Sequence, residues 1–441
     1  MAEKVLQLMG SLNTGGAENL VLDMLAFNSN LPQVKQTDFY VVYSVESEPE
    51  RIALFSKRVA DERVFFIKGG KGFKNTLGFI LRLRSFIKRH KIESIHCHNN
   101  VDAYLAAMAV GGSANYQTNY QANYPVNNSA NTPTIMLTVH GLNLNFNYIT
   151  NKVKDSRLMQ LFFKLFAGGR VTDYHFLKSM RLTFVSNATK RFYQERYANT
   201  GKTYKSTCYN PVDQLFARGE IITNAILPDK LLTAAPYSNL LSELHVSTSQ
   251  KPYFLMGMVG NFNTDARLQL MICKSLSLLP DNVSYRFVFV GKRSPIHPEY
   301  FDDCVKFCNE NGLKDKVIFA GARSDVPRIL KSLDCYVYGS AADTFGLSVI
   351  EAVISGLPVI CSDIPALREV LIDGSLGTLV MNTPEAFAYT IEREYSRFVD
   401  ADGNYSCSKE NPSCDVVDRQ ELALMHYSME STFYKYYTAV K

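Results

Sequence analysis

The segment from Asp343 to Val370, DTFGLSVIEAVISGLPVICSDIPALREV, constrains the fold more than any other part of the chain. A carboxylate, Asp343, precedes a turn at Gly346, and the apolar run that follows predicts a helix. Gly356-Leu357-Pro358 ends this helix, and Val359-Ile360-Cys361 predicts a buried strand. A loop, helix and strand in this order are typical of a parallel α/β sheet.

The predicted helix carries one carboxylate, Glu351, eight residues after Asp343. It is the only charged residue between Asp343 and Asp363, and no charged residue lies three or four positions from it, so we expect no ion pair within the helix. Burying an unpaired carboxylate costs several kcal/mol, roughly, unless hydrogen bonds compensate. The two hydroxyls of a ribose would supply them. A solvent-facing Glu351 in an ordinary packing unit is the alternative, and the helix alone leaves both open.

The start of the same helix is a candidate phosphate site. Backbone N–H groups near Phe345, Gly346 and Leu347 are expected to be free, at the positive end of the helix dipole. The segment could therefore hold both the phosphate and the ribose of a nucleotide.

Composition bounds the class of protein. The chain has 441 residues, of which 46% are hydrophobic and 20% charged, enough for two globular domains. The net charge of +5 suits an anionic ligand or a membrane surface and does not require nucleic acid. Nine cysteines without a signal peptide predict reduced thiols in the cytoplasm. We expect no transmembrane segment, and no metal site, since Cys304 and Cys308 lack a second pair at ligand spacing.

The N-terminus predicts a second phosphate cradle. A strand at Val5–Met9 leads through a Gly-rich loop containing Gly15 and Gly16 into a helix that starts at Ala17. The spacing is not G-x-G-x-x-G, which disfavours a Rossmann dehydrogenase. A tight turn without ligand is the alternative interpretation of the two glycines.

Strands and helices alternate through both halves of the chain and predict two doubly wound α/β domains. His140 follows the predicted strand Thr134–Val139, at the sheet edge where ligands bind in such folds. The predicted helix 76–91 is basic and amphipathic, so it could lie on anionic lipid or be a core helix with a solvated face. The uncharged tract 111–134 predicts a surface loop, and Asp400-Ala401-Asp402 a solvated insertion.

Four motifs, in this order, resemble those of retaining glycosyltransferases of family 4, which have the GT-B fold. They are Gly15-Gly16-Ala17-Glu18, Thr138-Val139-His140-Gly141, Asn210-Pro211-Val212-Asp213, and the pair Asp343 and Glu351 with Gly356-Leu357-Pro358-Val359. Where the family usually has Glu and Gly, this chain has Asp343 and Thr344, and Asn261 stands in place of a usual Arg.

The resemblance implies a role for each candidate residue. Asp343 and His140 would contact the donor sugar, and Glu351 the nucleotide ribose. The donor diphosphate would contact backbone and side chains at Gly15, Gly16, Asn261, Arg267, Phe345, Gly346 and Leu347. We expect no cofactor and no metal, because Arg267 and the helix dipoles would balance the diphosphate charge.

The resemblance also implies an organisation and an activity. We expect an N-terminal acceptor-side domain at 1–205, a linker at 206–250, a nucleotide-sugar domain at 251–418 facing the first across a cleft, and a helix at 419–441 that crosses back to the first domain. The implied reaction is transfer of a sugar, with retention, from a nucleotide-sugar donor to a hydroxyl of a glycan or lipid-linked acceptor. Synthesis of a bacterial cell-surface polysaccharide or lipopolysaccharide is the expected pathway. The place is the cytoplasm, with helix 76–91 as a candidate contact with the inner face of the membrane.

Two other functions remain open. One is a non-catalytic nucleotide-sugar-binding or scaffold protein, which the departures at Asp343, Thr344 and Asn261 would suit. The other is a nucleotide-sugar epimerase on the same fold, which would act without any acceptor.

Overall fold

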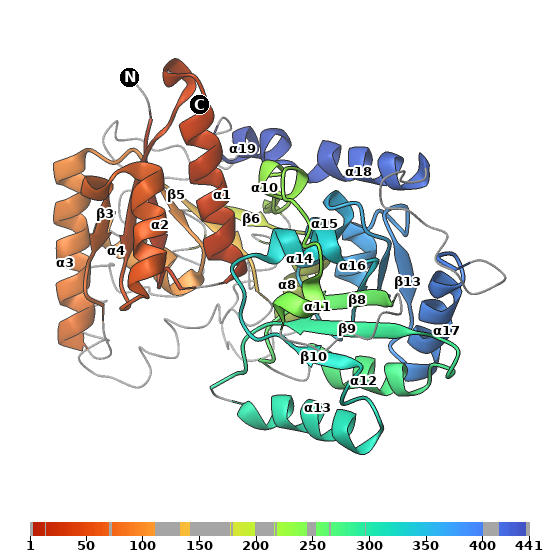
Figure 1. Ribbon diagram of the computed structural model, residues 1–441. Helices are drawn as coiled ribbons and strands as arrows, with labels where there is room; N and C mark the ends of the chain where they lie inside the picture. The colour runs from red at the N-terminus through yellow and green to blue at the C-terminus, as the bar shows by residue number, and fades with distance from the viewer. Residues whose placement is uncertain are drawn as a thin grey trace. The chain divides into compact units, whose positions relative to one another are not determined.

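The computed structural model describes residues 3–13, 15–69, 73–110, 133–141, 177, 180–198, 216, 218–244, 253–263, 266–295, 297–399 and 414–437 (Figure 1). The chain divides into two compact units. The first comprises Met1–Asn224 and Thr432–Lys441, and the second comprises Ala225–Ser431. The Asn210–Asp213 motif, Asp400-Ala401-Asp402 and nearly all of the tract 111–134 lie outside the described residues.

The first unit is built on a seven-stranded sheet in the order β3-β2-β1-β4-β5-β6-β7, with every neighbouring pair parallel. Its strands are β1 (Lys4–Met9), β2 (Asp38–Tyr43), β3 (Val64–Phe66), β4 (Ser94–Cys97), β5 (Thr134–Val139), β6 (Arg181–Phe184) and β7 (Glu220–Ile221). The central strands are almost wholly buried, as expected for a parallel sheet covered on both faces. Because β7 pairs with β6, the first sheet extends into the segment expected to be a linker.

Helices α1 and α2 pack beside each other, as do α3 and α4 (Figure 1). The helical segments of this unit are α1 (Gly16–Asn30), η1 (Gln33–Lys35), α2 (Pro49–Val59), η2 (Asp61–Arg63), α3 (Phe73–His90), α4 (Asn100–Val110) and α8 (Asn187–Ala198). Helix α3 confirms the predicted basic, amphipathic helix. Leu83 lies on its buried side, and Leu81 is exposed.

The end of the chain, Thr432–Lys441, belongs to the first unit, but the single helix expected at 419–441 is two helices, of which α18 (Cys414–Tyr427) lies in the second unit. Helix α19 (Met429–Tyr437) buries Phe433 and Tyr437, which pack against Phe39 of β2. Arg181 of β6 donates to the carbonyl oxygens of Lys435 and Tyr436, so it caps the last turn of α19. The returning helix is therefore fixed by both apolar packing and a buried cation.

The second unit repeats the same topology with six strands, in the parallel order β10-β9-β8-β11-β12-β13. The strands are β8 (Phe254–Val259), β9 (Tyr285–Val290), β10 (Val317–Phe319), β11 (Cys335–Tyr338), β12 (Val359–Ser362) and β13 (Thr378–Val380). The predicted strands of this half are confirmed, and Gly356, at φ 85°, ends the predicted helix.

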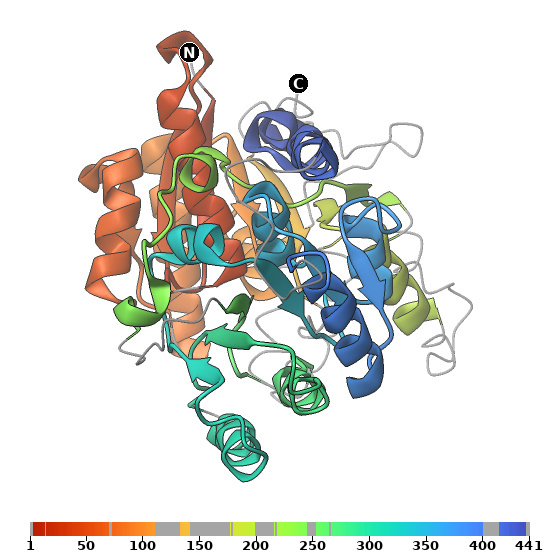
Figure 2. The ribbon, with the colours of Figure 1, turned by 45° about the vertical axis from the view of Figure 1, so that its right-hand side comes forward.

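Helix α12 packs beside α13 and α17, and α15 packs beside α18 (Figure 2). The helices of the second unit are α10 (Asp229–Leu232), α11 (Leu240–Glu243), α12 (Gln269–Ser277), α13 (Pro298–Glu310), α14 (Val326–Ser332), α15 (Leu347–Ile354), α16 (Pro365–Val370), α17 (Pro384–Tyr395) and α18 (Cys414–Tyr427). None of the helices in the described ranges is long and apolar enough to cross a membrane.

The two sheets share one functional feature. In each, the strand order reverses beside the first strand, between β1 and β4 in one sheet and between β8 and β11 in the other. Loops at the carboxyl ends of such strands diverge and leave room for a ligand. The residues that follow β4, β8 and β11 are therefore placed to contact a ligand.

Candidate functional site

Arg267 is placed by backbone pairing with the segment that follows β11. An isolated antiparallel bridge joins Arg267 to Ser340. The N–H of Leu268 donates to Gly339 O over 3.0 Å, and the N–H of Ala341 donates to Ala266 O over 2.8 Å. These bonds hold the loop after β8 against the loop after β11 at the switch point of the second sheet.

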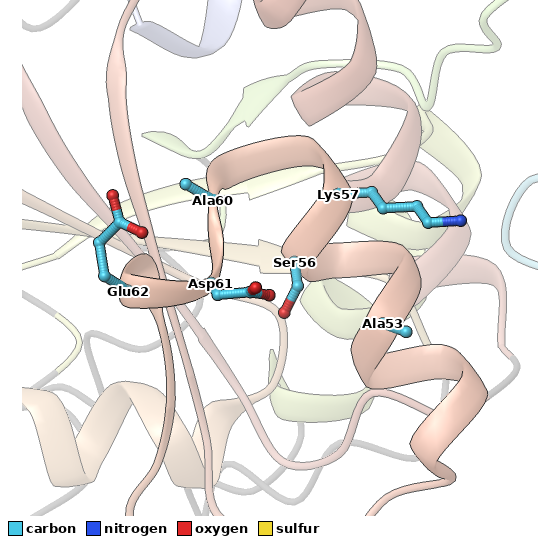
Figure 3. A pocket seen from close by; sticks show the side chains of 6 residues that line it. All are labelled: Ala53, Ser56, Lys57, Ala60, Asp61 and Glu62. Atoms are coloured by element: carbon cyan, nitrogen blue, oxygen red, sulfur yellow. The ribbon is translucent and has the colours of Figure 1, made fainter.

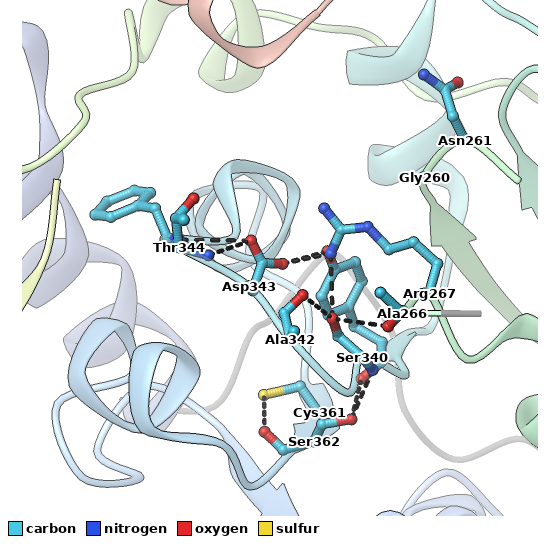
Figure 4. A network of polar contacts seen from close by, with 12 residues as sticks. Gly260, Asn261, Ala266, Arg267, Ser340, Ala342, Asp343, Thr344, Cys361 and Ser362 are labelled. Carbon is cyan, nitrogen blue, oxygen red and sulfur yellow. Dashed lines mark hydrogen bonds and ion pairs between the residues drawn. The ribbon is translucent and has the colours of Figure 1, made fainter. Parts of the chain in front are cut away.

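The side chain of Arg267 meets Asp343 there (Figure 4). Its Nη1 donates to Asp343 Oδ2, to the hydroxyl of Tyr338 and, over 3.4 Å, to Ser340 Oγ. The guanidinium also lies over the ring of Tyr338. Asp343 is 7% exposed and Arg267 31% exposed, so the pair is sheltered on the carboxylate side and accessible on the guanidinium side.

Asp343 also closes the backbone before α15. Its Oδ1 accepts the N–H of Thr344 over 2.8 Å and that of Phe345 over 3.5 Å, while Oδ2 accepts the Tyr338 hydroxyl over 2.8 Å. The prediction that the N–H of Phe345 is free was therefore wrong, because the preceding carboxylate turns back onto it. The Phe345 ring is buried and packs edge-on against Tyr427, so it belongs to the core.

Helix α15 itself begins at Leu347, after Gly346. Gly346 has a φ of 84°, and a Cβ there would lie 2.6 Å from Leu367 Cδ2, so glycine is required at this turn. Within the part of the chain that the structure describes, no side chain caps this helix start. The backbone near Gly346 and Leu347 thus keeps the features predicted for an anion site.

Glu351 is not the unpaired carboxylate that its helix neighbours predicted. Its Oε1 lies 3.5 Å from Lys230 Nζ, and its side chain is 21% exposed. Lys230 lies on α10, more than a hundred residues earlier in the sequence, which is why spacing within the helix missed it. Glu351 remains accessible to a ligand, with a cation beside it.

Asn261 stabilises the loop after β8. Its Oδ1 accepts the N–H of Lys292 over 2.8 Å, and its carbonyl oxygen accepts Gln269 Nε2 over 3.3 Å. Figure 4 shows its side chain apart from the pair of Arg267 and Asp343. Its predicted contact with a donor stays a prediction.

In the first unit, Gly15 and Gly16 lie at the start of α1, as predicted. Gly15 is the N-cap of α1. The carboxylate of Glu18 lies so close to it that a Cβ on Gly15 would overlap the carboxylate. Burial raises the pKa of Glu18, although its own backbone N–H and Arg51 favour the charged form. A phosphate at this helix start would compete with Glu18.

His140 follows β5 and joins a buried polar cluster. Its Nε2 lies 3.0 Å from His98 Nδ1, and its side chain also hydrogen-bonds to Asn224. Burial lowers the pKa of His140 to about 4, so the ring is neutral at pH 7. The next residue is held as well, because Tyr193 donates its hydroxyl to Gly141 O over 2.6 Å.

Sequence reasoning missed several of the contacting residues. Tyr338 and Lys230 contact Asp343 and Glu351, and Asn224 contacts His140. The one local signal was Gln7, a polar residue in the apolar strand KVLQLM, which is wholly buried beside His98. Tyr338 lies five residues before Asp343, whereas Lys230 and Asn224 come from distant segments and required the fold.

A surface hollow lies elsewhere on the first unit, at the end of α2 (Figure 3). Its lining residues are Ala53, Ser56, Lys57, Ala60, Asp61 and Glu62. It contains none of the predicted site residues. Across the described ranges, no group of three or more His, Cys, Asp or Glu side chains is arranged to hold a metal ion.

Comparison with known sequences identifies one domain. Residues 243–396 match the family described as "Glycosyl transferases group 1". The chain is 25% identical over 123 residues to the lipopolysaccharide core biosynthesis mannosyltransferase LpsB of Rhizobium meliloti, covering 28% of this chain and 35% of that one. It is 24% identical over 287 residues to the UDP-Gal:alpha-D-GlcNAc-diphosphoundecaprenol alpha-1,3-galactosyltransferase of Escherichia coli, covering 65% of this chain and 61% of that one. The matched parts thus span less than two thirds of these relatives.

Comparison with solved structures concerns the whole chain. Anabaena HepE in complex with UDP and glucose superposes with a TM-score of 0.67 at 15% identity, covering 99% of each chain. The glycosyltransferase WaaG, involved in lipopolysaccharide biosynthesis, superposes with a TM-score of 0.57 at 12% identity, covering 98% of each chain. At these identities the likeness shows the fold. Residues 243–396 thus resemble the glycosyl transferases group 1 family, and the chain has the two-domain GT-B fold.

Proposed function

We propose that this protein is a retaining glycosyltransferase of family 4 that transfers a sugar from a nucleotide-sugar donor to a glycan or lipid-linked acceptor. The observation that supports this most is the sheltered pair of Arg267 and Asp343 at the switch point of the second sheet. A cation and an uncapped helix start lie beside the same carboxylate, as a departing diphosphate would need.

The pair can act by exchanging partners. Within the described part of the chain, the hydrogen bonds of Arg267 to Tyr338, Ser340 and Asp343 all use Nη1. The Nε–H and Nη2–H groups can therefore donate to a diphosphate. Each oxygen of Asp343 already accepts two hydrogen bonds. When Arg267 turns toward the diphosphate, Asp343 Oδ2 gains room for a sugar hydroxyl.

The other assignments follow the resemblance. Glu351 accepts the ribose hydroxyls, with Lys230 holding its carboxylate, and backbone at Gly15, Gly16, Gly346 and Leu347 contacts phosphate. His140 contacts the donor. No metal takes part, because the diphosphate charge is balanced by Arg267 and the helix dipoles.

Relatives and structural neighbours suggest the substrates. HepE was solved with UDP and glucose, and the Escherichia coli relative is named for UDP-Gal and a diphosphoundecaprenol acceptor. We propose a UDP-sugar donor, a lipid-linked acceptor and a place in bacterial polysaccharide or lipopolysaccharide synthesis on the cytoplasmic side of the membrane. The exposed residues Leu81, Arg82, Lys88 and Arg89 of α3 would contact the lipid surface.

The test is a transfer assay with UDP-glucose or UDP-galactose and undecaprenyl-diphosphate-linked N-acetylglucosamine. We expect a disaccharide product whose new bond has the α configuration of the donor, read by NMR. A β-linked product would contradict retention. Conversion of the UDP-sugar without acceptor would support an epimerase, and UDP binding without turnover would support a scaffold.

A further inference from the structure

A continuous chain of buried polar side chains runs through the first unit and ends at His140. Each neighbouring pair lies within 2.7 to 3.4 Å. In order, the groups are the carbonyl of Leu137, Thr183, Thr138, His96, Tyr437, Gln7, His98 and His140. The chain crosses the switch point between β1 and β4, where Gln7 and His96 are paired in register.

The direction of every hydrogen bond follows from the carbonyl at one end. Leu137 O can only accept, so Thr183 donates its single hydroxyl proton to it over 3.4 Å. Thr183 Oγ1 therefore accepts from Thr138 over 2.7 Å, and Thr138 Oγ1 accepts from His96 Nε2 over 2.8 Å. His96 thus carries its proton on Nε2, and its Nδ1 is an acceptor.

The second half continues through the C-terminal helix. His96 Nδ1 accepts the Tyr437 hydroxyl over 3.1 Å, so the Tyr437 oxygen accepts the Gln7 amide N–H over 2.7 Å. This orientation leaves Gln7 Oε1 facing His98 Nε2 at 2.9 Å, so His98 carries its proton on Nε2. His98 Nδ1 is then an acceptor, and His140 Nε2, at 3.0 Å, must donate to it.

The remaining nitrogen of His140 is therefore a lone-pair acceptor. His140 also has Asn224 beside it. The tautomer of His140 follows from the directed chain that begins at Leu137 and reaches His140 through His98.

We propose that Tyr437 is a positioning residue that holds His140 in the neutral Nε2–H tautomer. The role of His140 toward a sugar rests on the proposed function. The tautomer does not, because it is a property of the folded chain alone.

Burial supports this arrangement. It lowers the pKa of His96 and His98 well below the usual range and that of His140 to about 4, so all three rings are neutral at pH 7. A neutral ring has one donor and one acceptor, which a directed chain requires. Reversing one hydrogen bond alone would leave two donors or two acceptors facing each other in the protein interior.

Tyr437 is the link that the returning helix supplies. Removing its hydroxyl leaves the Gln7 amide without its acceptor, so the amide can turn by 180° and present N–H to His98. His98 would then protonate Nδ1 and donate to His140 Nε2, which reverses the tautomer of His140. The effect of Tyr437→Phe thus reaches His140 through two intervening side chains.

The experiment measures the ring nitrogens of His140 by NMR. Protein labelled with 15N-histidine carries eight histidines, and a His140→Gln variant assigns the signals of His140. The wild-type protein should show a protonated Nε2 and an unprotonated Nδ1 at pH 7. Tyr437→Phe should shift His140 to a mixture of tautomers or to Nδ1–H, and turnover should fall by about tenfold, as for other residues that orient a functional side chain.

Tyr436→Phe is the matched control. Tyr436 is buried on the same helix beside the His96 ring, but its hydroxyl donates to Ile222 O over 3.5 Å and is not a member of the chain of hydrogen bonds described above. This variant should keep the wild-type tautomer. A wild-type His140 with its proton on Nδ1, or a folded Tyr437→Phe protein with an unchanged tautomer, would overturn the proposal. A changed tautomer in a protein without transferase activity would sustain it and count against the proposed function instead.

Discussion

The two units share one strand order, yet their candidate sites at the switch points are built from opposite materials. In the second unit, Arg267 and Asp343 form an ion pair that is partly open to solvent. In the first unit, His140 ends a chain of neutral, buried side chains. The difference teaches that one topology can orient a side chain for a ligand in two ways. One is an ion pair whose cation can turn to the ligand, and the other is a row of hydrogen bonds with a fixed direction.

The hydrogen-bonded side chains of the first unit include Tyr437, so they depend on how α19 packs against the sheet. Weakening that packing should have the largest effect on stability. Arg181 is 4% exposed, makes two bonds to Glu220 and donates to two carbonyls of α19. Arg181→Met should lower the free energy of unfolding by about 3–5 kcal/mol, since it leaves Glu220 and the helix end unpaired. Urea unfolding followed by circular dichroism measures this.

Arg63→Met is the comparison variant for Arg181. Its pair with Asp38 is about one-third exposed on each side, so we expect a change of at most about 1 kcal/mol. Equal losses in the two variants would show that Arg181 has no special role in seating the helix.

The ion pair of the second unit should be sensitive to charge. Asp343→Asn keeps the shape of the side chain and removes the charge that orients Arg267, so kcat should fall by about 100-fold. Steady-state transfer assays measure it. Asp302→Asn alters an exposed pair with Arg293 in the same unit and should leave kcat within about twofold.

The three neutral histidines of the first unit should make the stability of the protein depend on pH. Because the folded pKa values of His96, His98 and His140 lie below about 6.5, the unfolded state binds more protons, and stability falls as pH drops from 6.5 toward 4. Asp102 opposes this, because burial raises its pKa to about 7. The net slope near pH 5.5 should be about 2 kcal/mol per pH unit.

Urea titrations at several pH values test this balance. Asp102→Asn removes the opposing group and should steepen the loss on acidification. A flat profile between pH 7 and 5 would mean that the three rings are not held neutral.

The smallest effect that we predict is on ribose binding. Glu351→Gln should weaken binding of a nucleoside diphosphate by about tenfold, because one charge-assisted hydrogen bond is replaced by a neutral one. Calorimetric titration with UDP measures this. Glu385→Gln, at an acidic residue in the first turn of α17, is the control, and an unchanged affinity in Glu351→Gln would remove Glu351 from the site.

The sequence predicted what is local or periodic. The alternation of strands and helices, the turn at Gly346 and the return of the end of the chain to the first unit are all confirmed. Its failures concern the partners of two carboxylates. Lys230 reaches Glu351 from another helix, and that contact leaves no trace in residue spacing because it depends on how separate segments pack. The carboxylate of Asp343 turns onto the N–H of Phe345, a local contact between positions i and i+2 that the assumption of free N–H groups at the helix start overlooked.

The central claim, that the second unit binds a nucleotide sugar, is tested most directly by thermal shift with a panel of nucleoside diphosphates and nucleotide sugars. A ligand present at about a hundred times its dissociation constant stabilises a protein by about 2.7 kcal/mol. We expect such a shift with UDP and a UDP-sugar, and a smaller one in Asp343→Asn. No shift with any nucleotide in the panel would contradict the claim.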